Sequence, residues 1–377
     1  MHGTVNTHHS GQAAITAVLC ALVALGCEQE DPCAEEVAGT ICPVAGTGAL
    51  GFNQDGKPPQ ETDFYLISRA RRGPDGLLYL MDFNNWRIRR LDLDGLIRTF
   101  AGNGVHGFAF DGAPALESPL DNPIDFAFAP DGRLIMVSIE DPRVIAVEDG
   151  ILRVLAGAPE LGTVGNEGDG GSPIHARFMQ LNGIALAADG GIYVSDSMAN
   201  RVRVIRDGVI TTMAGDGEAG YRGDGGPASQ ASLRYPTALA FDGAGNLLIA
   251  DSLNHVVRRV SPEGTIDTIA GTGQPGLSGD GEAAVAARLR EPNGLAVGED
   301  GVLYIADRSN FRVRAVGLDG RIDTVAGTTL GYGGDGGPAV DAQFGYLARL
   351  TYDRGGLLIA DQSNGCIRRF VLDDGSQ

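Results

Sequence analysis

The sequence has few of the residues that most often build enzyme active sites and metal centres. Only 6 of its 377 residues are histidine and only 5 are cysteine. It contains no Gly-x-Ser-x-Gly, His-Glu-x-x-His or phosphate-loop motif, and no Cys-x-x-Cys pair or Cys/His cluster with zinc spacing. These absences argue against a serine hydrolase, a zinc protease, a nucleotide hydrolase and a structural zinc site.

Basic residues are scarce relative to acidic ones. Lys and Arg number 29 against 48 Asp and Glu, which gives a formal net charge of -19. Nucleic acids and anionic membrane surfaces would be repelled by this charge, so neither is expected as a partner. Binding of a cationic ligand is compatible with this charge.

A continuous apolar segment occurs near the start of the chain. Residues 13–25 are apolar but too few to span a bilayer comfortably, which is typical of a secretory signal peptide. Gly26-Cys27 then resembles the lipobox of bacterial lipoproteins, in which the cysteine is acylated. We therefore expect a signal peptide over residues 1–27 with lipidation at Cys27, followed by a linker over residues 28–38. The protein would be exported and lipid-anchored to a bacterial membrane, facing the periplasm or exterior; ordinary secretion and an uncleaved segment are the alternatives.

The rest of the sequence is a repeat. A hydrophobic segment that ends in Ala-Gly begins at Gly39, Gly95, Gly150, Gly208, Gly264 and Gly320, with successive differences of 56, 55, 58, 56 and 56. An Asp-Gly pair in a glycine-rich loop recurs with nearly the same spacing, at Asp55, Asp111, Asp169, Asp224, Asp280 and Asp335. Self-similarity at such a period indicates stacked supersecondary units.

Each unit has the pattern of four short strands. In the copy with the clearest pattern we expect strands at 238–241, 247–250, 256–260 and 209–213, separated by turn sequences. No apolar pattern in these repeats is long enough for an ordinary helix. Six four-stranded sheets around an axis form a six-bladed β-propeller, so we predict an all-β fold in one domain over residues 39–377.

The segment 249–260, with Asn254-His255 at its centre, resembles the NHL repeat, which is named after an Asn-His-Leu signature. The pattern recurs at 79–91, 193–205, 304–316 and 358–370, so the resemblance covers about residues 39–377. The copy at 135–147 departs most: Ser138 replaces the aspartate that ends the second strand, and Asp141-Pro142 replaces Asn-x. Blade two is therefore expected to be degenerate or specialised.

The two ends of the array complement each other. Residues 39–46 have the pattern of a fourth strand, but the first three strands of a blade do not precede them. At the other end, the last blade has its third strand at residues 366–371 and no fourth strand after it. We predict that the N-terminal strand completes the last blade and closes the ring. This pairing sets Cys42 near Phe370 and away from Cys366, so Cys33 with Cys42 is the favoured disulfide among the three cysteines left after cleavage.

Five blades end their second strand with an aspartate: Asp82, Asp196, Asp251, Asp307 and Asp361. We predict that these are structural turn caps that accept backbone N–H groups of the following loop, because a catalytic acid need occur only once. Seven residues after each comes an arginine, Arg89, Arg203, Arg258, Arg314 or Arg368, expected to be solvated or paired with loop carboxylates.

Strand direction places the Asp-Gly loops and the strand-two loops on one face of the propeller. Turn chemistry already explains their composition, but the face would also be acidic and rich in oxygen donors. The NHL resemblance then implies an extracytoplasmic recognition or scaffold module without enzymatic activity. We expect a monomer that binds a protein or polymer through this acidic loop face.

Two enzymatic alternatives remain. Leu181-Asn182-Gly183 and Pro292-Asn293-Gly294 resemble the Asn-Gly pairs with which gluconolactonase-like propellers hold a divalent ion. That resemblance implies a calcium-dependent hydrolase with Asp125, Asn182 and Asn293 as metal ligands at the channel mouth. Against it, Asp125 lies one residue off the asparagine register, and Ser68 or Arg69 stands where that family has a glutamate. A zinc lyase would need His106, His175 and His255, which fall in different blades or loops.

Overall fold

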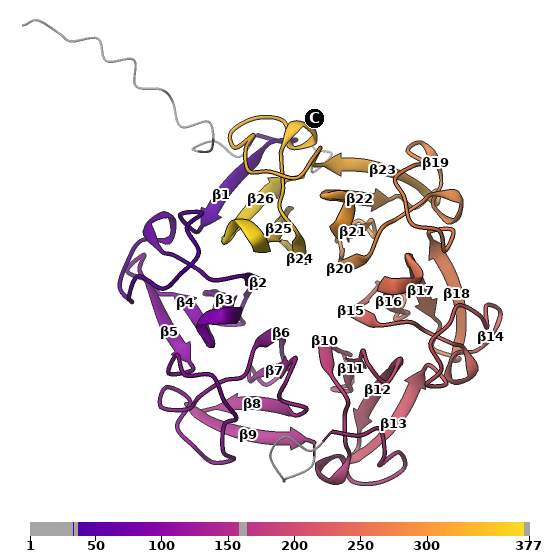
Figure 1. Cartoon of the computed structure of the whole chain (residues 1–377), viewed down its shortest axis with the longest axis horizontal. Helices are drawn as coiled ribbons and strands as arrows, with labels where there is room; N and C mark the ends of the chain where they lie inside the picture. Colours follow the sequence, from indigo (N-terminus) through magenta and orange to yellow (C-terminus); the bar gives the residue numbers. More distant parts are fainter. Residues whose placement is uncertain (1–32, 34–36, 158–163, 373–377) are drawn as a thin grey trace, which may run out of the picture.

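The structure, a computed structural model, describes residue 33, residues 37–157 and residues 164–372. Six antiparallel sheets surround a central axis, as Figure 1 shows. Each sheet has four main strands, and the only helices in the described part are short 3-10 turns. The predicted all-β six-bladed propeller is confirmed.

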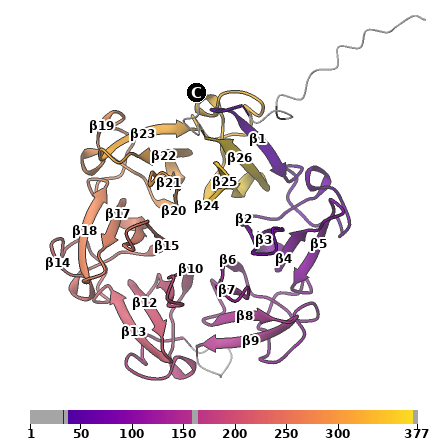
Figure 2. The same cartoon turned by 180° about the vertical axis from the view of Figure 1, so that it is seen from behind.

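The first strand of each blade lies next to the axis and the fourth lies at the outer edge (Figures 1 and 2). In this order, blade one comprises β2 (Ile67–Arg72), β3 (Leu78–Asp82), β4 (Arg87–Leu91) and β5 (Ile97–Ala101), and blade two comprises β6 (Pro123–Phe128), β7 (Leu134–Ser138), β8 (Val144–Glu148) and β9 (Ile151–Ala156). Blade three comprises β10 (Leu181–Leu186), β11 (Ile192–Asp196), β12 (Arg201–Arg206) and β13 (Val209–Ala214), and blade four comprises β15 (Pro236–Phe241), β16 (Leu247–Asp251), β17 (Val256–Val260) and β18 (Thr265–Ala270). Blade five comprises β20 (Pro292–Val297), β21 (Leu303–Asp307), β22 (Arg312–Val316) and β23 (Arg321–Ala326), and blade six comprises β24 (Leu347–Asp353), β25 (Gly356–Asp361), β26 (Cys366–Val371) and β1 (Ile41–Ala45).

The 3-10 turns fall at two kinds of position. Four follow a second strand: η2 (Phe83–Asn85), η5 (Ser252–Asn254), η7 (Arg308–Asn310) and η9 (Gln362–Asn364). Five lie in the connections that enter a blade: η1 (Pro59–Glu61), η3 (Pro173–His175), η4 (Ala228–Gln230), η6 (Ala284–Ala286) and η8 (Ala339–Asp341). None of the described helices has the length and apolarity that a bilayer span requires.

The core lies between adjacent blades. All five residues of β16 are buried, because this second strand is covered on both faces. Val204 and Tyr193 of blade three pack in one cluster with Leu239 and Ile249 of blade four, and equivalent clusters join the other neighbouring blades. A blade cannot bury these side chains alone, so the fold depends on the complete ring.

The entering connections also cover the outer sheet edges. Two residues of such a connection, β14 (Gly226–Pro227), pair with β18 of the blade they enter, and β19 (Glu282–Ala283) pairs with β23 in the same way. These short fifth strands occupy hydrogen-bonding groups that an exposed edge strand would offer to other chains.

The ring closes as predicted. β1 pairs antiparallel with β26, with Ile41 opposite Phe370 and Cys42 opposite Arg369. The predicted disulfide between Cys33 and Cys42 is present, and Cys366 is a buried free thiol. The expected signal peptide and Cys27 lie outside the described residues.

Candidate functional site

The five strand-two aspartates are buried caps, but their backbone partners differ from the predicted ones. Asp82 Oδ1 accepts the N–H of Tyr65 at 2.9 Å, and Asp251 Oδ1 accepts that of Arg234 at 2.7 Å. Asp196, Asp307 and Asp361 accept those of Met179, Arg290 and Gly345. These donors lie in the connection that enters the blade. The loop that follows also contributes, through the side-chain amides of Asn85, Asn254, Asn310 and Asn364 and, at Asp196, the backbone N–H of Ala199. Each carboxylate thus holds the entry to strand one against the end of strand two.

The carboxyl groups of these caps carry perturbed pKa values. Burial raises the pKa of each of the five to about 6, against the smaller opposing effect of their hydrogen bonds and the nearby arginines. Their recurrence in five blades indicates a structural role for the shift, because a catalytic acid would be expected once.

The arginines of strand three are paired with loop carboxylates, the second of the two predicted alternatives, and they are fully buried, not solvated. Arg258 contacts Asp224 of the entering loop at 2.6 Å and Asp251 at 3.5 Å. Arg89, Arg203, Arg314 and Arg368 likewise reach Asp55, Asp169, Asp280 and Asp335 at 2.5 to 2.9 Å. The loop aspartates are therefore the partners of buried guanidinium groups, and the loop face is less acidic than its sequence indicates. A buried charge that loses its partner is strongly destabilising.

Blade two lacks this ion-pair network. Ser138 and Ile145 stand where the other blades have aspartate and arginine, as the sequence indicates. Arg143 instead forms a buried pair with Asp141 at 2.6 Å and donates to the carbonyl of Ala109. The repeat therefore tolerates loss of the network when both partners are replaced.

The histidine of the NHL-like signature forms a hydrogen bond between one blade and the next. His255 Nδ1 accepts the backbone N–H of Glu291, at the entry to blade five, and burial lowers the pKa of this imidazole. Asn200 at the equivalent position accepts the N–H of Tyr235, and Trp86 donates to Asn122. His255 is thus a blade-to-blade contact.

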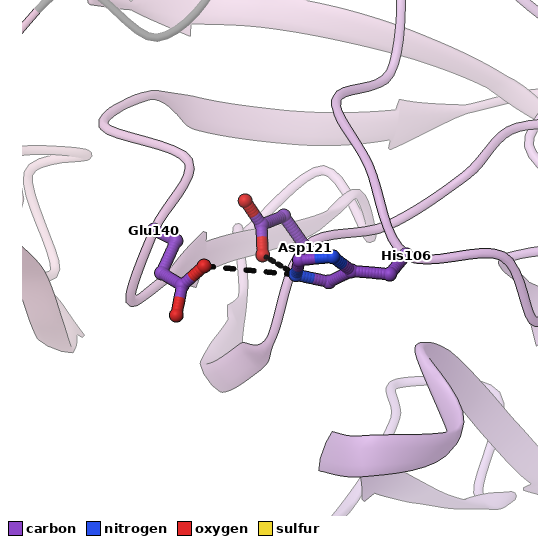
Figure 3. Close-up of side chains that lie close together, drawn as sticks. All are labelled: His106, Asp121 and Glu140. Atoms are coloured by element: carbon purple, nitrogen blue, oxygen red, sulfur yellow. Dashed lines mark ion pairs between the residues drawn. The ribbon is translucent and has the colours of Figure 1, made fainter.

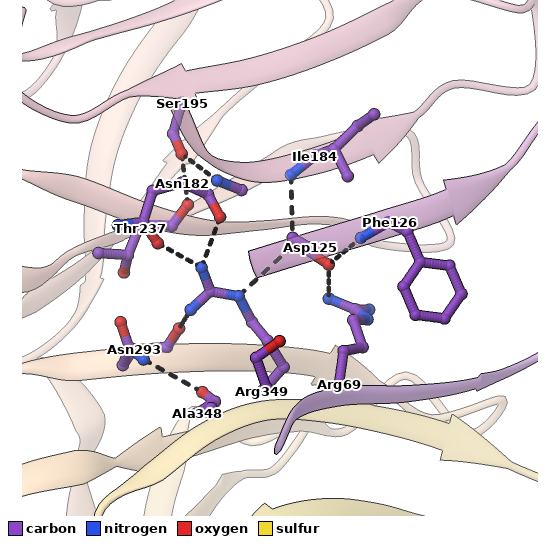
Figure 4. Close-up of polar contacts among 12 residues, drawn as sticks. Arg69, Asp125, Phe126, Asn182, Ile184, Ser195, Thr237, Asn293, Ala348 and Arg349 are labelled. Atoms are coloured by element: carbon purple, nitrogen blue, oxygen red, sulfur yellow. Dashed lines mark hydrogen bonds and ion pairs between the residues drawn. The ribbon is translucent and has the colours of Figure 1, made fainter. Parts of the chain in front are cut away.

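An arginine–aspartate–arginine network crosses the propeller axis near the start of the first strands (Figure 4). Asp125 is fully buried, with Oδ1 at 2.9 Å from Arg69 Nη1 and Oδ2 at 3.4 Å from Arg349 Nε. The backbone N–H groups of Phe126 and Ile184 also donate to this carboxylate. Burial lowers the pKa of Arg349 to about 10. The first strands of blades one, two and six are therefore linked across the axis by charged side chains.

Arg349 also brings together the two asparagines that were predicted to bind metal. Its Nη2 donates to Asn182 Oδ1 at 2.5 Å and to the Asn182 carbonyl at 2.8 Å, and its Nη1 donates to the Asn293 carbonyl. The Asn293 amide donates to the Ala348 carbonyl. The predicted ligands do converge, but on a guanidinium group. This arrangement does not fit a calcium ion, because the only carboxylate of the set is already shared by two arginines.

The glycines that follow these asparagines have a packing role. A Cβ atom at Gly294 would lie 2.7 Å from the Ala348 carbonyl oxygen of the neighbouring blade, and one at Gly183 would collide with the Thr237 carbonyl. Asn-Gly at these positions is thus explained by the close approach of first strands at the axis.

A cavity of about 450 Å³ lies on the axis at the far ends of the first strands, away from the loop face. Its lining includes three arginines, Arg69, Arg71 and Arg72, and Asp353. Arg69 pairs with Asp125, and Arg72 pairs with Asp353 at 3.0 Å. Arg71 has no ion pair or hydrogen bond with any residue that the structure describes. Burial and the charge of Arg69 lower the pKa of Arg71 to about 9, so it remains protonated at neutral pH.

Sequence reasoning missed both Arg349 and Arg71. The repeat does contain a signal for the first, because Arg349 occupies the same position of strand one as Arg69, Asp125 and the glycines after the two asparagines. No sequence feature marks Arg71, whose lack of a partner depends on the packing of six blades.

Comparison with known proteins places the chain among propellers. Residues 273–331 match the family model of the teneurin NHL domain. The chain is 28% identical to Protein SUPPRESSOR OF QUENCHING 1, chloroplastic, of Arabidopsis thaliana over 74% of its own length and 27% of that protein. It is 27% identical to NHL repeat-containing protein 2 of Bos taurus over 72% of its own length and 42% of that protein.

The chain thus spans less than half the length of these relatives. Among solved structures, an auxiliary nutrient binding protein from Bacteroides thetaiotaomicron superposes with a TM-score of 0.63 at 16% identity, over 87% of this chain and 75% of that one. At this identity the superposition shows a shared fold. Together, these comparisons show that the chain is a six-bladed β-propeller whose sequence is similar to those of NHL-repeat proteins.

Proposed function

We propose that this propeller is a non-enzymatic recognition module that binds a small anionic ligand, such as a carboxylate or phosphate compound, in its axial cavity. The proposal rests on one observation. The Arg71 side chain lines the cavity and forms no ion pair or hydrogen bond with the residues that the structure describes. The cavity volume of about 450 Å³ falls within the range of small-molecule sites.

The chemistry of the cavity favours an anion. Three arginines line the cavity, whereas Asp353 is the one carboxylate among the lining residues, and Asp125, which pairs with Arg69, is shared with Arg349. A planar guanidinium binds carboxylate and phosphate through two parallel hydrogen bonds. The rest of this cavity is lined largely by apolar residues, among them Phe128 and Phe241, which would strengthen the ion pair by excluding water.

Calorimetric titration of the protein with citrate at low ionic strength tests this proposal. We expect saturable binding of one citrate per chain, weakened at least about tenfold in Arg71→Gln because a charge-assisted contact is lost. Arg259→Gln is the matched control, since Arg259 is an exposed arginine on β17. Equal citrate binding by wild type and Arg71→Gln would contradict the proposal. Calcium binding that disappears in an Asn182→Ala, Asn293→Ala double variant would instead favour the hydrolase alternative.

Binding of a protein or polymer to the loop face stays a prediction. One feature supports it: half-exposed apolar side chains recur at equivalent positions of four blades, at Phe52, Tyr221, Leu277 and Tyr332. Phe52, Tyr221 and Tyr332 also lie over the buried arginines Arg89, Arg258 and Arg368, which fixes their positions.

We also propose that the protein is exported and anchored through Cys27. The apolar segment 13–25 followed by Gly26-Cys27 supports this proposal. The Cys27→Ala variant is expected to move from the membrane fraction to the soluble fraction on cell fractionation. A wild-type protein that is already soluble would contradict lipid anchoring.

A further inference from the structure

Blade two carries a cluster of one histidine and two carboxylates on the loop face (Figure 3). His106 Nε2 lies 2.7 Å from Asp121 Oδ1 and 3.6 Å from Glu140 Oε2. His106 and Asp121 belong to the connection that enters blade two, and Glu140 follows strand β7. One ligand atom from each residue lies within 4.8 Å of the other two.

The other five blades provide an internal comparison, because the repeat defines equivalent positions. Where blade two has His106, the others have Leu50, Val164, Ala219, Pro275 and Leu330. Where it has Asp121, they have Tyr65, Met179, Arg234, Arg290 and Gly345, and where it has Glu140, they have Asn84, Met198, Leu253, Ser309 and Ser363. Three groups able to bind metal thus occur together in one blade only. The repeat scaffold does not require them, so the cluster is a local specialisation.

Asp121 is the buried member of the cluster. Its side chain is 3% exposed, and Oδ1 accepts no hydrogen bond from the described residues. His106 Nε2 lies 2.7 Å from this oxygen but can donate to it only in the tautomer or charge state that places a proton on Nε2. A buried carboxylate oxygen that accepts no hydrogen bond is stabilised by a bound cation.

We infer that His106, Asp121 and Glu140 form a binding site for a divalent transition-metal ion such as zinc. A ligand set of one imidazole nitrogen and two carboxylate oxygens suits zinc and its neighbours, whereas calcium takes oxygen ligands. The side chains of His106 and Glu140 are 46% and 56% exposed, so water can complete the coordination. The ion would join the entering connection to the strand-two loop, at the blade where the arginine–aspartate network is absent.

The single tryptophan of the chain gives a local readout. Trp86 has its ring centroid 5.4 Å from that of His106 and donates its indole N–H to Asn122, next to Asp121. Zinc added to chelator-treated full-length protein is expected to change Trp86 emission and to saturate at one ion per chain. Calcium at the same concentration is expected to leave the emission unchanged.

Variants separate metal binding from a simple histidine–aspartate pair. Glu140→Gln changes an exposed side chain and leaves His106 beside Trp86, so it should fold normally and bind zinc more than about tenfold more weakly. Asp121→Asn should weaken binding at least as much. His175→Leu, which changes an exposed histidine of η3, is the control and should bind like wild type. The histidines within residues 1–10 are present in wild type and in every variant, so any zinc that they bind contributes equally to each titration. An unchanged zinc titration in Glu140→Gln, or no response of wild type, would overturn the inference.

Discussion

Removal of residues 28–46 is expected to abolish the cooperative unfolding of the propeller. The deletion takes away β1, whose Ile41 and Ala45 are buried, and exposes the full length of β26 as a sheet edge. The ring would then end in an incomplete blade that can neither cover its core nor join the two termini. We expect either no cooperative transition in thermal denaturation or a melting temperature lower by about 10 °C or more.

A second truncation separates the contribution of the strand from that of the disulfide. A chain that starts at residue 37 keeps β1 but loses Cys33, the partner of Cys42. It should retain a single cooperative transition, at a somewhat lower temperature because the crosslink is lost. If both truncated chains unfold like the intact protein, strand β1 does not close the ring.

Replacement of one buried arginine is expected to produce the largest effect of any single substitution. Arg258→Ile removes a fully buried guanidinium that pairs with Asp224 and Asp251, and leaves the buried Asp251 carboxylate without a countercharge. We expect the free energy of unfolding to fall by about 3–5 kcal/mol, the range measured when one member of a buried ion pair is removed. Chemical denaturation of wild type and variant gives this difference.

Blade two supplies the matched control for this prediction. The double variant Asp251→Ser, Arg258→Ile copies the residues that blade two carries at Ser138 and Ile145. It removes both buried charges together, so it should be more stable than Arg258→Ile alone. The double variant could instead be less stable than Arg258→Ile by as much as Asp251→Ser alone destabilises the wild type. That result would show that the two residues act independently.

The fold was predictable because each blade repeats the same local chemistry. The six glycine-led segments fixed the number of blades, and the unmatched segment 39–46 predicted closure by β1, which pairs with β26 as expected. The burial of Arg258 was not predictable in the same way. An arginine in an alternating strand indicates a solvent-facing position, and its burial follows from an aspartate that the entering loop contributes 34 residues away.

The axis was harder to predict than the blades. Asp125 and Arg349 lie 224 residues apart and meet only because the ring closes. The sequence indicated oxygen donors at Asn182 and Asn293, and both do face the axis, but it gave no sign that a long cationic side chain from blade six would reach between them.

The blade-two cluster escaped sequence reasoning for a different reason. His106, Asp121 and Glu140 match no known metal motif, and 14 and 18 residues separate them along the chain. The signal lies in the repeat, since none of the other blades has a histidine or a carboxylate at any of the three equivalent positions.

Anomalous diffraction from crystals soaked with selenate or with calcium tests most directly what the axis binds. Selenate is a tetrahedral dianion, and we predict a selenium peak beside Arg71 in the axial cavity. We predict no calcium peak between Asn182 and Asn293, where Arg349 contacts both residues. A calcium ion bound to Asn182 and Asn293 with Arg349 displaced from Asp125, and no selenate at Arg71, would contradict the account.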